Sequence, residues 1–166
     1  MRVLGIDPGT VTTGYGVVEE SGGRLVYVEA GGITTSAKLP FPERLKIIYD
    51  GLEAVIARHR PDAVAVESLF FAKNVQSALK LGHARGVAVL AAVNAGLPVS
   101  EYSALEIKKA VVGYGQAEKE QVMKMVGTLL GMRELPKPLD ATDALAAAIC
   151  HINSARVAAA MARAKR

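Results

Sequence analysis

The stretch Ala63-Val64-Ala65-Val66-Glu67 consists of four apolar residues in a row followed directly by a carboxylate. A short, continuous apolar run between polar residues is typical of a strand buried on both faces, as in a parallel sheet. Before it, apolar residues recur at helical spacing over 43–59 until Pro61. A helix followed by a doubly buried strand predicts an α/β fold.

The residues before that helix predict a three-stranded meander. Residues 2–7, 12–19 and 24–33 are rich in strand-forming side chains, and Ser21-Gly22-Gly23 marks a hairpin. Gly14 and Gly16, inside the second strand, indicate close approach by another backbone or a ligand.

After the buried strand, the sequence predicts a helix over 74–95 and a last short strand over 97–102. Ser103 and Glu106 form a capping-box pattern that begins another helix. Further helices are expected over about 118–130 and from near Asp140. No repeat or linker interrupts the chain, so residues 1–166 are expected to form one domain, a mixed five-stranded sheet flanked by helices.

Composition excludes several classes of protein. The chain has 166 residues, 51% of them hydrophobic and 22% charged, which is typical of a folded globular domain. Apolar runs such as Val87–Val93 fall far short of the ~20 residues of a membrane span, and no signal segment is evident at the N-terminus. A single cysteine, Cys150, excludes an internal disulfide and suits a reducing compartment. We therefore expect a cytoplasmic protein without a membrane partner.

Four carboxylates stand where a site would form. Asp7 and Glu67 each end a predicted strand, and sites in open α/β sheets lie beyond the carboxyl ends of strands. Asp140 and Asp143 share one face of a helix start. Each of these acids also has a purely structural alternative. Asp7 would set the turn that follows it, and Glu67 would mark the point where the strand reaches solvent. Asp140 would cap the helix, and Asp143 would be stabilised by the helix dipole.

Converging carboxylates repel one another unless a cation lies between them. Oxygen ligands without a Cys or His cluster favour Mg²⁺, with Mn²⁺ able to substitute. Two divalent ions would balance the charge of four carboxylates, and paired ions suit phosphoryl displacement. The three histidines show no metal-ligand spacing. The sequence therefore predicts a two-metal site.

The net charge of +4 arises from 20 basic and 16 acidic residues, and Arg156, Arg163, Lys165 and Arg166 place four positive charges at the end. Residues 1–155 are thus neutral, but they become positive once the four candidate ligands are set aside. The excess lies in residues 68–100 and 107–137, each three positive charges in surplus. Such blocks suit DNA phosphates, although solvated helix faces are the common alternative.

Two further features lie within the first of these blocks, residues 68–100. Phe70 and Phe71 lie three and four residues after Glu67 on a predicted loop. One of the two rings would stack on a base, and we expect Phe70 to do so. Gly82 and Gly86 have small-xxx-small spacing within a helix. They allow either a two-fold dimer contact or close packing on the protein's own sheet.

Short motifs occur in order along nearly the whole chain. Each is weak alone, but together, in register, they are highly specific. They are Ile6-Asp7-Pro8-Gly9, Val66-Glu67 followed by Phe70, Ala72-Lys73-Asn74, Ser77-Ala78-Leu79-Lys80-Leu81-Gly82, Gly113, Ala117-Glu118-Lys119, and Asp140-Ala141-Thr142-Asp143-Ala144-Leu145-Ala146. This set resembles the RuvC-type Holliday-junction resolvases.

The resemblance implies a ribonuclease H-like fold, a homodimer, and Mg²⁺-dependent nicking of two opposed strands of a four-way DNA junction, leaving 5′-phosphate ends. It also implies cooperation with the RuvA–RuvB branch-migration machinery. The implied catalytic residues and metal ligands are Asp7, Glu67, Asp140 and Asp143, with Lys119 giving electrostatic help. The residues expected to contact DNA are Phe70, Lys73, Asn74, Lys80, Arg85, Lys108, Lys109 and Lys119.

Two other functions remain open at the level of sequence. Asp7-Pro8-Gly9-Thr10 with Gly14 resembles the phosphate-binding opening of actin- or hexokinase-like ATPases, which pair two such domains, whereas this chain supplies one. A DNA-structure binder with a decayed site is the second alternative, and the presence of all four acids argues against it.

Overall fold

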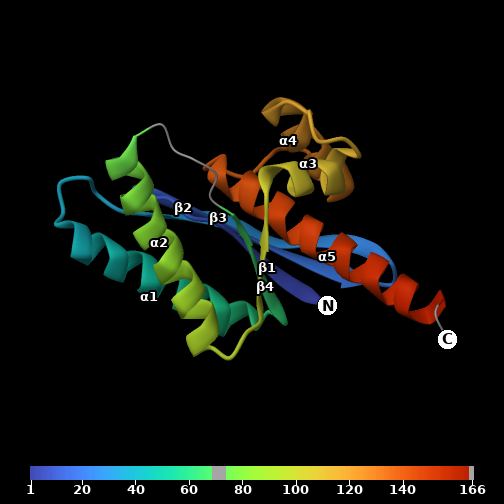
Figure 1. The fold of residues 1–166 in the computed structure, drawn as a ribbon, viewed down its shortest axis with the longest axis horizontal. Helices are drawn as coiled ribbons and strands as arrows, with labels where there is room; N and C mark the ends of the chain where they lie inside the picture. The colour runs from blue at the N-terminus through green and yellow to red at the C-terminus, as the bar shows by residue number, and fades with distance from the viewer. Residues whose placement is uncertain (69–73, 165–166) are drawn as a thin grey trace.

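The computed structural model describes residues 1–68 and 74–164. A five-stranded sheet runs through its middle in the order β3-β2-β1-β4-β5 (Figure 1). β1 pairs antiparallel with β2 and parallel with β4, which confirms the predicted mixed sheet. The strands are β1 (Arg2–Asp7), β2 (Thr12–Ser21), β3 (Arg24–Thr34), β4 (Ala63–Glu67) and β5 (Val99–Tyr102).

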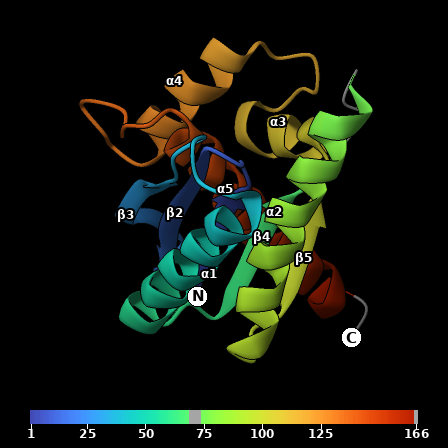
Figure 2. The same cartoon turned by 90° about the vertical axis from the view of Figure 1, so that its left-hand side faces the viewer.

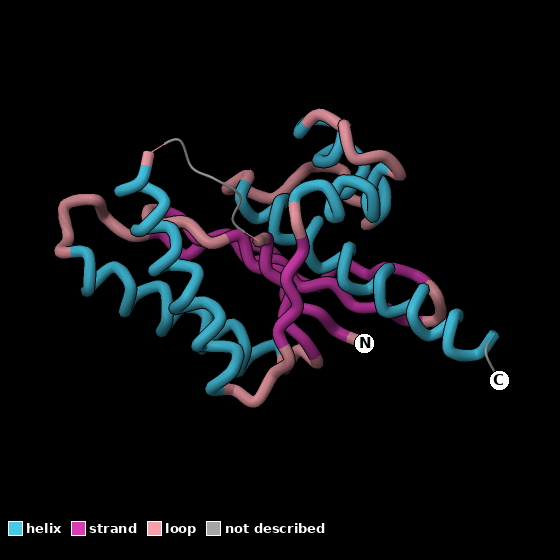
Figure 3. The backbone as a smooth tube through the Cα atoms, in the orientation of Figure 1, coloured by secondary structure: helices cyan, strands magenta, loops and turns pink. Residues whose placement is uncertain are grey.

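Helices cover both faces of this sheet. Figures 1 and 3 show α1 and α2 on one side of the strands and α5, with α3 and α4 beside its beginning, on the other. The capping box of Ser103 and Glu106 opens α3 as predicted. The helices are α1 (Phe41–His59), α2 (Val75–Asn94), α3 (Ala104–Val112), α4 (Lys119–Leu129) and α5 (Asp140–Ala164).

β4 is buried on both faces, as its sequence predicts. Val64 and Val66 pack into the core beneath α1 and α2, whereas Ala65 joins the core on the α5 side. β1 divides in the same way, with Leu4 toward α1 and α2 and Val3 toward α5. The two central strands are therefore held from both sides, which makes their carboxyl ends a rigid platform.

Glycines bring α5 unusually close to the sheet. A Cβ at Gly5 would lie 1.8 Å from the carbonyl oxygen of Ala144, and one at Gly16 would lie 2.7 Å from the Leu145 side chain. The close approach predicted for Gly16 is therefore made by α5. By length and composition α5 also passes as a membrane span, but its first half is buried against the sheet, as in a core helix.

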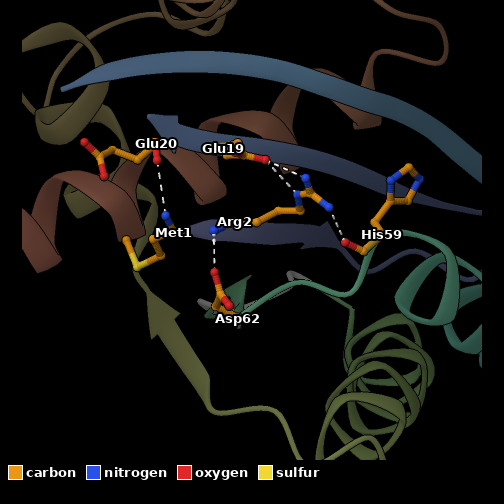
Figure 4. A network of polar contacts seen from close by, with 6 residues as sticks. All are labelled: Met1, Arg2, Glu19, Glu20, His59 and Asp62. Atoms are coloured by element: carbon orange, nitrogen blue, oxygen red, sulfur yellow. Dashed lines mark hydrogen bonds and ion pairs between the residues drawn. The ribbon is translucent and has the colours of Figure 1, made fainter. Parts of the chain in front are cut away.

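A polar network fixes the end of the sheet opposite Asp7 (Figure 4). The Arg2 guanidinium donates from Nε and Nη2 to Glu19 Oε2 at 2.9 and 2.6 Å, and from Nη1 to the His59 carbonyl at 2.7 Å. The Arg2 backbone N–H donates to Asp62 Oδ2 at 2.7 Å. These bonds join β1 to β2, to the end of α1 and to the approach to β4, and so hold β1 in register.

Candidate active site

Asp7 and Glu67 lie side by side because of strand register. Ile6 pairs with Val66 in the parallel β1–β4 ladder, so the next residue of each strand is a carboxylate at the same edge of the sheet. The turn after Asp7 is closed by Thr13, whose hydroxyl donates to the Gly9 carbonyl at 2.8 Å and accepts from the Gly9 N–H at 3.3 Å. Thr13 is completely buried, and sequence reasoning missed it because nothing marked it apart from other strand threonines.

The beginning of α5 brings the aspartate pair to the same place. Gly14 is the register partner of Asp7 on β2, and a Cβ on Gly14 would lie 2.2 Å from the carbonyl oxygen of Asp140. The missing side chain therefore lets the first turn of α5 lie against the strand next to Asp7. The close approach predicted from Gly14 is made by the backbone that carries Asp140 and Asp143.

A cavity of about 370 Å³ opens at this point. Three of the four predicted acids, Asp7, Glu67 and Asp143, line it, whereas Asp140 lies close enough to act on Asp7 by charge. Lys108 from α3 and Lys119 from α4 complete its polar lining. The apolar part of the wall, which the sequence did not single out, consists of Ala104, Ile107, Val122 and Ala146.

The carboxylates perturb one another strongly. Burial, followed by the negative charges of Asp143, Glu67 and Asp140, raises the pKa of Asp7 from 3.8 to about 7, and the charge of Lys119 opposes this shift. Burial is also the main cause of the raised pKa of Glu67, followed by Asp143. Burial and the neighbouring carboxylates thus disfavour the ionised form of Asp7, and a cation bound among the carboxylates would favour it.

Lys119 supplies part of that positive charge. Its Nζ donates to Asp143 Oδ2 at 2.7 Å, and this hydrogen bond raises the pKa of the lysine. The contact joins the first residue of α4 to the first turn of α5, which lie 24 residues apart.

The four carboxylates suit hard divalent cations, but they do not form a closed ligand set. Within residues 1–68 and 74–164, no three Asp, Glu, His or Cys side chains are arranged to hold a metal ion as they stand. The donor chemistry and the raised pKa of Asp7 nevertheless fit Mg²⁺ or Mn²⁺.

Only some of the residues predicted to contact DNA lie at the cavity. Phe70 and Lys73 lie outside the described residues. Of the two neighbouring lysines on α3, Lys108 lines the cavity, whereas Lys109 lines a separate groove beside Cys150. Successive helical residues point about 100° apart, so only one of the pair faces the site.

Two other predicted DNA contacts have structural partners. The Asn74 side chain caps α2 by accepting from the backbone N–H groups of Gln76 and Ser77 at 2.9 and 3.2 Å. Arg85 forms an ion pair with Glu101 of β5, which neutralises one positive charge of the 68–100 block. Lys80, on the same helix, remains exposed.

Comparison with known proteins places this geometry in a family. The family model described as crossover junction endodeoxyribonuclease RuvC matches residues 3–151. The RuvC of Pelobacter propionicus is 60% identical over 93% of this chain and 87% of that protein, and the RuvC of Geobacter sulfurreducens is 59% identical over 93% and 94%.

Solved structures agree with this placement. The structure of T. thermophilus RuvC in complex with a Holliday junction substrate superposes with a TM-score of 0.90 and 40% identity, covering 95% of this chain and 96% of that one. The yeast mitochondrial Holliday junction resolvase Ydc2 shares the fold at 12% identity with a TM-score of 0.68. The strand-end acids, the first turn of α5 and these similarities together show that the chain belongs to the RuvC family of crossover junction endodeoxyribonucleases.

Proposed function

We propose that this protein is a Mg²⁺-dependent endonuclease that resolves four-way DNA junctions by paired nicks in opposed strands. The observation that supports this proposal most directly is the convergence of Asp7, Glu67 and Asp143 on one cavity that also holds two lysines. The four acids would bind metal cations, and these cations together with the two lysines would hold a phosphodiester. The family relationship indicates that the phosphodiester belongs to a DNA junction.

Asp7, Glu67, Asp140 and Asp143 would hold two Mg²⁺ ions, with Mn²⁺ able to replace them. Bound divalent ions would supply Lewis-acid chemistry, making water a stronger nucleophile and stabilising the leaving 3′-oxygen. The nicked strand would then carry a 5′-phosphate. Asp7, the most strongly perturbed of the acids, must lose its proton before it can serve as a ligand.

Lys119 and Lys108 would act on the substrate. Both lysines line the cavity from the α3 and α4 side, and both charges lower the pKa of Glu67 against the effect of burial. We assign Lys119 to the charge that develops on the scissile phosphate and Lys108 to a neighbouring phosphate. Phe70 stays our predicted base-stacking residue, on the strength of the sequence alone.

We propose that two copies associate through α2, because two opposed nicks need two active sites. Along one stripe of α2, Val75, Leu79, Leu90 and Val93 are exposed, with Val75 74% accessible. A Cβ at Gly82 or Gly86 would meet no described atom within 4 Å, so these glycines do not pack on the protein's own sheet. The alternative of close packing on the sheet is thereby removed, and an apolar stripe with two glycines suits close helix contact with a second copy.

We further propose that residues 1–166 form one nuclease domain that acts in the cytoplasm together with RuvA and RuvB. α5 supports the single domain, since one helix both carries two of the acids and packs along β1 and β2. Cys150 is a buried free thiol, which suits a reducing compartment. Cooperation with RuvA and RuvB rests on the family relationship.

The test is cleavage of a synthetic four-way junction in Mg²⁺ by wild type, Asp7→Asn and Glu67→Gln, with Asp50→Asn as a control on an exposed carboxylate. We expect wild type and the control to make symmetric nicks that ligase can reseal, and the site variants to bind without nicking. Equal cleavage by the site variants would refute the assignment. Binding without cutting by wild type would favour a pure junction binder, and a melting temperature raised by a nucleotide would favour the ATPase.

A further inference from the structure

Arg44 is a buried cation that forms no ion pair within the described residues. It lies in the first turns of α1 and is only 8% exposed. Its Nε donates to the Thr10 carbonyl at 3.0 Å and to Thr35 Oγ1 at 3.2 Å, and its Nη2 also donates to the Thr10 carbonyl. Both acceptors are neutral, and no described carboxylate forms an ion pair with it. Burying a charge without a counter-charge is costly unless a ligand supplies one.

One nitrogen of this guanidinium is left for such a ligand. Nη1 donates to no described residue, and it is not among the enclosed polar atoms, so it reaches the surface. The other two nitrogens hold the orientation of the group. A planar guanidinium held in this way is suited to bind a phosphate oxygen through its remaining N–H groups.

Lys80 brings a second cation to the aromatic ring that Arg44 contacts. The Phe41 ring lies 5.6 Å from Arg44 Cζ and 6.0 Å from Lys80 Nζ, so the two cations of α1 and α2 contact one aromatic ring. Figure 2 shows these two helices running alongside each other. Residues 68–100 contain no acid that could neutralise Lys80 locally. Two cations that share one aromatic ring and have no described ion pair suit an anionic ligand.

Arg44 lies at the same edge of the sheet as the candidate active site. Thr10, whose carbonyl Arg44 binds twice, lies in the turn that begins directly after Asp7. β3 runs parallel to β1, and α1 follows it, so α1 begins at the edge of the sheet where Asp7 lies. A DNA strand that places one phosphate at Asp7 would bring a neighbouring phosphate toward this edge.

We propose that Arg44 and Lys80 form a subsite for a backbone phosphate of the DNA, near the scissile one. The subsite rests on the proposed nuclease function, because its ligand is the same DNA. Arg44 has two tasks in it: two nitrogens hold the turn after Asp7, and the third binds the phosphate. A phosphate bound by Arg44 would therefore be linked, through this one side chain, to the turn that follows Asp7.

The experiment measures binding of a fluorescent four-way junction in EDTA over a range of NaCl concentrations. The variants are Lys80→Gln, Arg44→Lys and, as control, Lys46→Gln, an exposed lysine of α1 that pairs with Asp50 at 2.5 Å. We expect Lys80→Gln to raise Kd about 3–10-fold near 0.1 M salt and to reduce the salt slope by about 0.9, as the loss of one phosphate contact requires. Arg44→Lys keeps the positive charge but loses the planar guanidinium, so this variant should bind the junction more weakly than wild type. Urea unfolding checks that the variant is folded.

A scan with neutral methylphosphonate linkages then locates the phosphate. One linkage near the cut should weaken binding to wild type and have no further effect on Lys80→Gln, because both changes remove the same contact. Equal salt slopes for Lys80→Gln and Lys46→Gln, with wild type binding and cutting normally, would overturn the subsite alone. Failure of wild type to bind the junction would overturn both the subsite and the proposed function.

Discussion

Gly14 lies so close to Asp140 that a Cβ on the glycine would come within 2.2 Å of the Asp140 carbonyl oxygen. Because Gly14 is also the register partner of Asp7, one small residue sets the separation between the strand-end acid and the first turn of α5.

Gly14→Ala is therefore expected to push α5 away from the sheet. We expect a loss of about 1–3 kcal/mol of unfolding free energy from overpacking, together with a larger loss of junction cleavage. Urea unfolding and a nicking assay measure the two effects. Ser21→Ala, an exposed position at the end of the same strand, is the control. Unchanged stability and cleavage in Gly14→Ala would show that α5 is not held by this contact.

The raised pKa of Asp7 predicts a pH-dependent stability. Between the unfolded value of 3.8 and the folded value of about 7, the unfolded chain ionises first, so Asp7 stabilises the fold below pH 4 and loses this contribution as pH rises to 7. In EDTA at pH 8, Asp7→Asn should be more stable than wild type by on the order of 1–3 kcal/mol, and the difference should vanish near pH 4.

Urea unfolding between pH 4 and 8 measures this difference. Asp50→Asn, which alters an exposed carboxylate on α1, should give a small and nearly constant effect. A difference between Asp7→Asn and wild type that does not change with pH would contradict the assigned shift.

Lys119 is expected to compete with divalent cations for Asp143. Lys119→Met removes the ammonium that contacts Asp143 Oδ2, so the metal-free site becomes more repulsive. Addition of Mg²⁺ should then raise the Tm of the variant about 2–4 °C more than that of wild type. Cleavage should fall about 100-fold through loss of charge stabilisation. Lys108→Met is the matched control, because this lysine lines the same cavity without a described ion pair, and an equal Tm gain in both variants would rule out the competition.

The α2 stripe predicts how the dimer can be broken. Leu79→Asp would bury a carboxylate in the apolar contact and weaken association about 100-fold, since an unpaired buried charge costs several kcal/mol. Analytical ultracentrifugation should show a monomer, and nicking of the two opposed strands should become uncoupled. Val157→Asp, at an exposed position in the second half of α5, should remain dimeric. A Leu79→Asp protein that stays dimeric would place the interface elsewhere.

Local patterns in the sequence determined the sheet, the capping box of Ser103 and Glu106, and the acids at the ends of two strands. The continuous apolar run Ala63-Val64-Ala65-Val66 and the carboxylate that follows it are properties of neighbouring residues, so they can be recognised without coordinates. Gly14 marked a close approach for the same reason, because its missing side chain is visible in the sequence.

Only the tertiary structure decided which residue each charged side chain contacts. Lys119 contacts Asp143 across 24 residues, Arg85 is neutralised by Glu101, and Arg44 holds a turn that lies 34 residues before it. Such contacts depend on how helices lie against the sheet, which no local pattern encodes. The sequence alone therefore predicted the charged groups that converge on the cavity, whereas packing between distant segments determined their neighbours, the direction of their pKa shifts and the apolar wall beside them.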